Sequence, residues 1–91
     1  MLFEENAKSF IVTVSVELKT GVFDPAAAQV QKTLVGLDFP MVSKTVMGKF
    51  FRLTLDALDE PHARKLCEDM ASKLLANPVM EKFDIVSIRP G

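Results

Sequence analysis

A regular alternation of side chains over residues 10–18 limits the possible folds more than any other feature of this 91-residue chain. One set of alternate positions is apolar and comprises Phe10, Val12, Val14, Val16 and Leu18. The positions between them are mostly polar and hold Ile11, Thr13, Ser15 and Glu17. A repeat of two residues, rich in β-branched side chains, predicts a half-buried β-strand. Such a strand needs neighbouring strands and a second layer that covers its apolar face.

A turn and the start of a helix follow this strand. Gly21 breaks the alternation and is expected in the turn. Asp24 can accept hydrogen bonds from the free backbone amides of a helix start, and Pro25 suits the first helical position. Gly36 is expected to end this helix. Its apolar stripe comprises Ala27, Val30, Leu34 and Leu37.

Residues 42–47 and 50–56 predict two further strands. Gly48 and Lys49 separate them, and glycine at the first central position fits a two-residue type II′ hairpin turn. We therefore expect a tight hairpin, with Gly48 in the turn and Lys49 exposed at its tip.

A second amphipathic helix is predicted to open at residues 59–61, where acidic side chains favour a helix start. Its apolar stripe comprises Ala63, Leu66, Cys67, Met70, Ala71, Leu74 and Leu75. The helix must end near Asn77, because Pro78 disfavours α geometry in the residue before it and has no backbone N–H. Residues 83–88 predict a last short strand.

The predicted order is β-α-β-β-α-β, a two-layer α+β domain. This is the ferredoxin-like layout, with an antiparallel sheet and both helices on one face. We expect one domain over residues 9–91, preceded by an N-terminal extension over residues 1–8. A chain this short buries a small core, so we also expect homo-oligomerisation.

Composition excludes several kinds of partner. The formal net charge is −1, with 11 basic and 12 acidic residues, so we expect neither nucleic acid nor a membrane surface as a partner. No apolar run approaches the ~20 residues that span a bilayer. The single cysteine forms no internal disulfide, and the acidic start lacks the pattern of a signal peptide. We therefore expect a cytoplasmic protein.

The chain shows no catalytic or metal-binding constellation. Its one histidine, His62, lies five residues from its one cysteine, Cys67, on the same predicted helix, so the two side chains diverge. Cys67 is expected in the core and His62 on the surface. A phosphatase of the acylphosphatase kind would need an arginine in the loop over residues 19–23, which has none. Adjacent phenylalanines at 50 and 51 point to opposite faces, which disfavours an RNA-recognition strand.

Three segments of the chain carry a resemblance when they are taken together. The first is Leu18-Lys19-Thr20-Gly21-Val22-Phe23-Asp24-Pro25, the second is Gly48-Lys49, and the third is Lys73-Leu74-Leu75-Ala76-Asn77-Pro78-Val79-Met80-Glu81. In this order they resemble the PurS family, the small accessory subunits of phosphoribosylformylglycinamidine synthase. The family typically has proline and leucine where this chain has Thr20 and Phe23. The similarity runs over about residues 10–88.

The resemblance implies a non-catalytic role in purine biosynthesis. PurS subunits form dimers or dimers of dimers and bridge the ATP-dependent synthetase subunit and the glutaminase subunit, so that ammonia can pass between them. It implies no cofactor bound by this chain, since ATP and magnesium are used by the synthetase subunit. The resemblance also implies no active site in this chain.

Individual residues keep two interpretations each. Gly21, Asp24 and Pro25 are explained by the turn and the helix cap, with docking as a second interpretation. The candidate interface or docking residues are Lys49, Asn77, Pro78 and Val79. The last three form a corner that could contact the synthetase or a sister protomer. The alternative function, from a different class, is a stand-alone ACT-like module that senses small molecules. Such modules have the same β-α-β-β-α-β order of elements.

Overall fold

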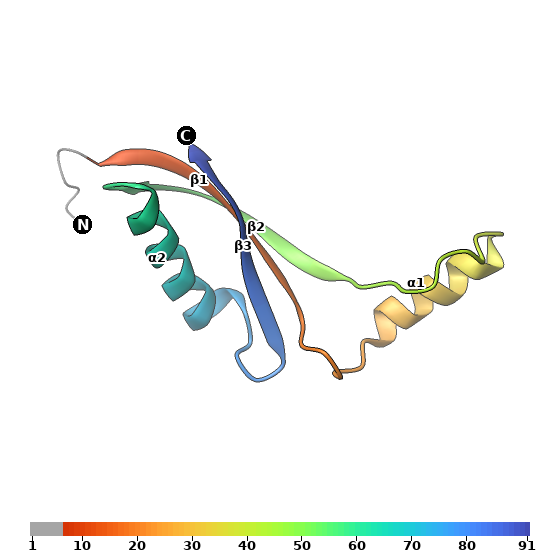
Figure 1. Ribbon diagram of the computed structural model, residues 1–91. Coiled ribbons are helices and arrows are strands. Elements are labelled where there is room, and N and C mark those ends of the chain that lie inside the picture. The colour runs from red at the N-terminus through yellow and green to blue at the C-terminus, as the bar shows by residue number, and fades with distance from the viewer. Residues whose placement is uncertain (1–6) are drawn as a thin grey trace.

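The computed structural model describes residues 7–91, which form one three-stranded sheet and two helices (Figure 1). The strands are β1 (Lys8–Leu18), β2 (Gly48–Ala57) and β3 (Glu81–Pro90), in the order β2-β1-β3 with both pairings antiparallel. The helices are α1 (Pro25–Gly36) and α2 (Glu60–Met70). A five-residue π-helix, η1 (Ala71–Leu75), continues α2.

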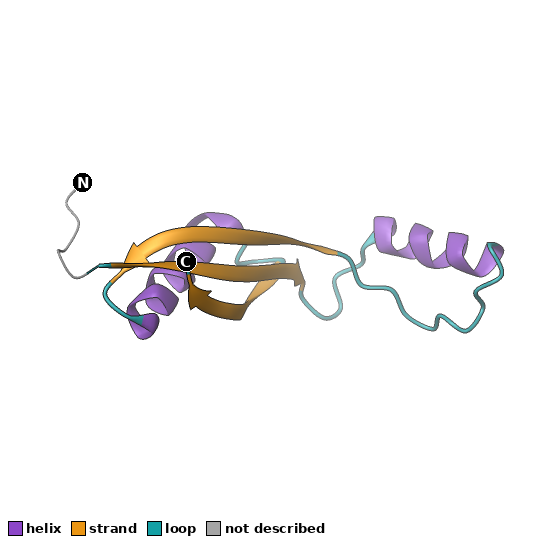
Figure 2. Cartoon of the chain, turned by 90° about the horizontal axis from the view of Figure 1, so that it is seen from above, coloured by secondary structure: helices purple, strands orange, loops and turns teal. Residues whose placement is uncertain are grey.

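The core lies between the central strand and α2. The apolar side chains of β1 predicted to be buried include Val12, Val14 and Val16, which are 0 to 1% exposed. They pack against Ala63 and Cys67 of α2, and α2 contacts all three strands. Figure 2 shows α2 lying along one side of the sheet. The alternation in β1 therefore identified the buried face of the sheet correctly.

Cys67 belongs to this core, as predicted. Its side chain is fully buried, and burial raises the pKa of the thiol. The neutral thiol is therefore favoured and is a poor nucleophile. His62 differs from expectation, because it is half-buried instead of exposed: its Nδ1 accepts a hydrogen bond from the Leu58 backbone N–H at 2.9 Å. The two residues thus have separate structural roles.

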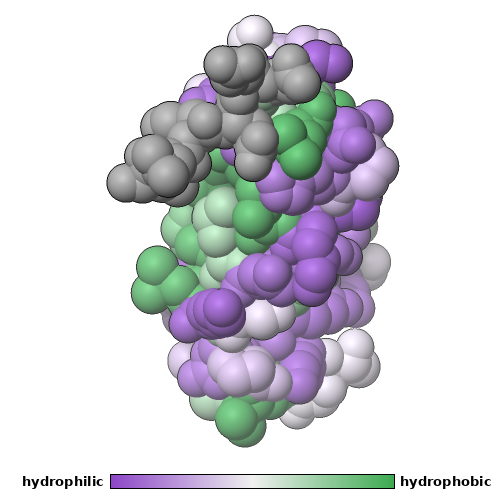
Figure 3. All heavy atoms as spheres, turned by 90° about the vertical axis from the view of Figure 1, so that its left-hand side faces the viewer, coloured by the Kyte–Doolittle hydropathy of each residue, from purple (hydrophilic) through white to green (hydrophobic). Residues whose placement is uncertain are grey.

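The outer side of the molecule near α2 is mixed in character. Figure 3 shows this side, where hydrophilic groups dominate and hydrophobic ones form smaller areas between them. None of the helices within residues 7–91 is long and apolar enough to cross a membrane. Of the predicted extension over residues 1–8, the first six residues lie outside the described part of the chain, and Lys8 opens β1.

The α+β class and the ferredoxin-like layout with its antiparallel sheet are confirmed, but one strand and one helix position were predicted wrongly. Residues 42–47 form no strand, so the sheet has three strands over residues 7–91. Helix α1 does not cover the sheet; it lies beyond the sheet's end (Figures 1 and 2). We call residues 19–47 the arm. The radius of gyration is 17.2 Å, against about 12 Å for a compact chain of this length.

The expected hairpin turn at Gly48 and Lys49 is also wrong, and the pairing of β2 explains why. Gly48 lies opposite Glu17 and Lys49 opposite Val16, so both residues belong to the ladder with β1. Residues 42–47 therefore continue beyond the sheet in the direction of β2 and do not fold back. A Cβ on Gly48 would lie 2.3 Å from the Val16 backbone oxygen. Glycine is needed there for a close approach of two strands and not for a turn.

Helix α1 ends at Gly36, as predicted, but the residue with positive φ that closes it lies two positions later. The Phe39 N–H donates to the Leu34 carbonyl at 3.0 Å, and the Asp38 N–H donates to the Val35 carbonyl at 3.2 Å. These are the two bonds of a Schellman motif, and they place Asp38 at φ 78°. The left-handed conformation that the motif requires is thus supplied by an aspartate and not by Gly36.

We expect Asp38→Gly to strengthen this helix end, because glycine adopts positive φ without the Cβ penalty of about 1 kcal/mol. Hydrogen exchange of the amides in the last turn of α1 should slow several-fold. Asp38→Ala is the matched control and should speed the same exchange, because alanine has neither glycine's freedom nor aspartate's tolerance of this conformation. Equal exchange in all three proteins would contradict the assignment.

Candidate functional site

The turn after β1 is built as the sequence suggested. Gly21 has φ 90°, and the Val22 N–H donates to the Lys19 carbonyl at 3.1 Å. The Asp24 carboxylate accepts from the Ala26 and Ala27 backbone N–H groups at 3.0 and 3.1 Å, with Pro25 as the first helical residue. These contacts fix the direction in which the arm leaves the sheet.

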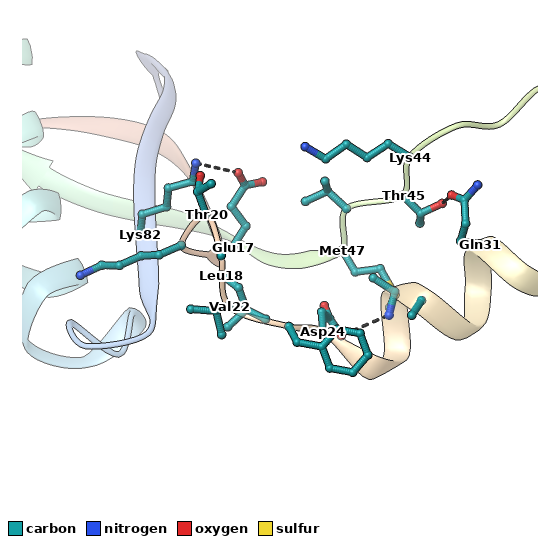
Figure 4. A pocket seen from close by; sticks show the side chains of 16 residues that line it. Glu17, Leu18, Thr20, Val22, Asp24, Gln31, Lys44, Thr45, Met47 and Lys82 are labelled. Atoms are coloured by element: carbon teal, nitrogen blue, oxygen red, sulfur yellow. Dashed lines mark hydrogen bonds and ion pairs between the residues drawn. The ribbon is translucent and has the colours of Figure 1, made fainter.

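The arm is also held together internally (Figure 4). The Gln31 side chain donates to the Val42 carbonyl and accepts from the Thr45 hydroxyl. Since Gln31 lies on α1, it binds the returning segment 42–47 to the helix. An open cavity of about 380 Å³ lies where the arm joins the sheet, with Lys44 and Lys82 on its rim. Sequence reasoning missed Gln31, because a polar residue on an exposed helix gives no local sign of its partner.

Lys49 lies in β2 and not at a hairpin tip. Its ammonium is 3.7 Å from the Glu81 carboxylate, and half of its side chain is exposed. An exposed pair of this kind contributes about 0–1 kcal/mol. Lys49 therefore remains accessible to a partner, but on the sheet surface near the start of β3.

The corner between η1 and β3 is braced by its asparagine. The Asn77 side-chain oxygen accepts from the Val79 N–H at 2.9 Å and, more weakly, from the Met80 N–H at 3.4 Å. Its own backbone N–H donates to the Glu81 carboxylate at 2.7 Å. This Asx turn supplies a reason for asparagine before Pro78 that the helix stop alone does not give.

Lys19 ties the same corner to the end of β1. Its ammonium donates to the Pro78 carbonyl at 2.7 Å, and its backbone N–H donates to the Met80 carbonyl at 2.8 Å. Two segments that the sequence analysis singled out separately are thus in contact. The corner is fixed from both sides, while the Val79 side chain stays 78% exposed.

The expectation that Leu74 and Leu75 both belong to the core is half wrong. Leu75 is 8% exposed, but Leu74 is 83% exposed. The cause is the π-helix, in which the Ala76 N–H donates to the carbonyl of Ala71, five residues back, at 3.0 Å. The wider turn keeps Ala71 and Leu75 inside and turns Leu74 outward. A helical stripe read at 3.6 residues per turn cannot reveal this change.

We define the corner patch as the exposed apolar side chains of this connection, which are Leu74, Pro78, Val79 and Met80. In the described part of the chain, no group of three or more His, Cys, Asp or Glu side chains could hold a metal ion. No polar side chain is buried among residues 7–91 either. The structural features that stand out are therefore surfaces: the corner patch and the arm.

Comparison with known proteins decides the family. The family model of PurS, described as phosphoribosylformylglycinamidine (FGAM) synthase, matches residues 11–88. The chain belongs to the PurS family. The PurS subunit of Archaeoglobus fulgidus is 41% identical over 76 residues, which is 84% of this chain and 95% of that protein.

Solved PurS structures share the fold. The Thermus thermophilus PurS structure matches with a TM-score of 0.83 and 30% identity, covering 91% of this chain and 98% of that one. Methanocaldococcus jannaschii PurS matches with a TM-score of 0.81 and 29% identity, covering 90% of this chain and 98% of that one. The latter is described as one of the subunits of formylglycinamide ribonucleotide amidotransferase in the purine biosynthetic pathway. These matches do not favour an ACT-like sensing module, so the PurS interpretation is kept.

Proposed function

We propose that this chain is the PurS subunit of phosphoribosylformylglycinamidine synthase. It joins the ATP-dependent synthetase and the glutaminase so that ammonia can pass between them during purine biosynthesis. The observation that carries the proposal is the PurS family match from β1 to β3, over residues 11–88. The protein itself binds no cofactor in this proposal, and ATP with magnesium is used by the synthetase. The complex works in the cytoplasm, where a free, unoxidised Cys67 is expected.

A reconstituted reaction tests the proposal. Purified synthetase and glutaminase should form formylglycinamidine ribonucleotide from glutamine about 100-fold faster when this chain is added, the scale that tethering two modules provides. With ammonium salt in place of glutamine, the rate should not depend on the chain, since no transfer between subunits is needed. A chain that binds neither subunit and leaves the glutamine-dependent rate unchanged does not have this function.

We also propose that two copies associate by exchanging arms. Residues 42–47 form neither a helix nor a strand, and β2 has a free edge in the order β2-β1-β3. In a ferredoxin-like sheet, the second strand pairs along the edge of the third, which here is β2. The α1 helix is uncovered, with Val30, Val35 and Leu37 at least 39% exposed. A partner's arm would complete the sheet and cover this helix. The exchange costs little free energy, because each element is already formed in the single chain.

Leu34→Glu is expected to prevent this association. Leu34 lies on the apolar stripe of α1, so a charge there would be buried against the partner. Sedimentation should show a dimer or larger assembly for the natural protein and a monomer for the variant. Lys32→Glu changes an exposed position of the same helix and should leave the assembly intact. If the Leu34→Glu variant forms an assembly of the same mass as the natural protein, arm exchange is contradicted.

A further inference from the structure

The corner patch combines exposure with rigidity. Leu74 and Val79 are 83% and 78% exposed, the largest values among the large hydrophobic side chains of residues 7–91. The backbone beneath Val79 is held by the Asx turn of Asn77 and by two hydrogen bonds from Lys19. Apolar side chains fixed in an exposed position are typical of binding sites, because little conformational entropy is lost when a partner binds them.

A hollow lies beside the patch. Its volume is about 300 Å³, and its apolar side is formed by Ala76, Pro78 and Phe83. Ser72 and three charged residues complete its lining. A hollow of this size next to exposed apolar groups fits the insertion of one apolar side chain from a partner.

The charges around the hollow are mostly positive. Lys19 and Lys82 line it, and Lys73 lies in η1, next in the chain to Ser72 of the lining. Glu81 is the acidic residue of the lining, and its carboxylate already binds the Asn77 N–H and the Lys49 ammonium. Lys82 is 3.3 Å from Glu17, while the Lys19 ammonium contacts a neutral carbonyl. A partner that presents acidic groups beside an apolar one would therefore complement this surface.

The arm of a second copy does not have this chemistry. Over residues 19–47 its acidic residues are Asp24, which caps α1, and Asp38, which ends it. The arm also exposes Lys32 and Lys44. A second copy therefore brings about as much positive as negative charge to the basic corner, and its arm is matched to the opposite edge of the sheet, at β2.

We propose that the corner patch and its hollow dock a protruding segment of one of the two catalytic subunits, with an apolar side chain flanked by carboxylates. The proposal rests on the function proposed above and assigns the docking surface within it. Leu74 and Val79 make the apolar contact, the hollow receives the inserted side chain, and Lys19 and Lys73 face the acidic groups.

Val79→Glu tests the proposal, because the side chain is exposed and its loss should not affect folding. Val86→Glu is the matched control: it is the same substitution at a valine of β3 that is 57% exposed, away from the corner. Binding of the full-length chain to purified synthetase and to purified glutaminase would be measured by calorimetry, and self-association by sedimentation.

We expect Val79→Glu to weaken binding to one catalytic subunit at least tenfold, with unchanged self-association, and Val86→Glu to bind as the natural protein does. Leu74→Glu should reproduce the loss. If the natural protein binds and Val79→Glu binds equally well, the corner is not the docking surface, although the proposed function stands. If Val79→Glu instead dissociates the copies, the corner contacts a second copy and the proposal is overturned. If the natural protein binds neither subunit, both proposals fail.

Discussion

Replacing Val14 with aspartate is expected to unfold the domain. Val14 is fully buried at the centre of the middle strand, opposite Phe51 on one side and Ile85 on the other. No polar side chain is buried near it, so a carboxylate there would have no partner. The cost is about 4 kcal/mol or more, which is most of the stability of a small domain at the lower end of the usual 5–15 kcal/mol.

Thr13→Asp is the matched control for this experiment. Thr13 is the preceding residue of β1, faces the other side of the sheet and lies opposite Arg52. The same new charge therefore points to the half-exposed face, beside a cation. Urea denaturation followed by circular dichroism should show a normal midpoint for Thr13→Asp and little or no folded baseline for Val14→Asp. Two similar midpoints would mean that the buried face has been assigned wrongly.

Gly48→Ala is expected to destabilise the sheet by about 1–3 kcal/mol, the usual cost of forcing extra volume into a closely packed site. The new methyl group would meet the backbone oxygen of Val16 at 2.3 Å, and a backbone atom cannot move aside as a flexible side chain can. We expect a lower denaturation midpoint and faster hydrogen exchange at the ends of β1 and β2 that border the arm.

Gly36→Ala provides the comparison for Gly48→Ala. A Cβ at Gly36 meets nothing within 4 Å, and the residue is helical. Alanine should therefore be neutral there or stabilise α1 by up to about 1 kcal/mol. If Gly48→Ala were as harmless as Gly36→Ala, the close approach of β2 to Val16 would not exist in solution.

The local patterns of the sequence predicted the individual elements well. The alternation over residues 10–18 found β1 within two residues, because every second side chain had to enter one core. Asp24 and Asp59 both cap helices, since the chemistry of a helix start depends on a few adjacent residues. These predictions, which depended on one segment and its immediate neighbours, were therefore confirmed.

Most of the predictions that failed depended on distant partners. The hairpin at Gly48 was wrong, because a glycine before a strand fits either a turn or a close contact, and only Val16 decides between them. Residues 42–47 have a strand-like composition, but a strand also requires an edge to pair with. Leu74 turns outward because of one wide helical turn that leaves no periodic signal.

For the candidate site, the sequence singled out a segment but not the contacts that hold it in place. The resemblance pointed to Asn77, Pro78 and Val79, yet the role of Lys19 in holding them could not be predicted, since the two segments are 59 residues apart. The docking roles of Lys49, Asn77, Pro78 and Val79 stay predictions, and the variants above test Val79 directly.

The irregularity in β3 has a consequence for how relatives of this chain are aligned. Between Thr13 and Val14 the register of the β1–β3 pairing shifts. Thr13 pairs with Ser87 and Val14 pairs with Ile85, so Val86 has no partner in β1. Phe83 and Ile85 face the core before this point and Ile88 faces it afterwards. A homologue that lacks Val86 would therefore keep all three apolar side chains inside, whereas the loss of a paired residue would turn part of the strand over. Natural length variation in this strand should accordingly concentrate at Val86, and a one-residue gap there is compatible with an unchanged core.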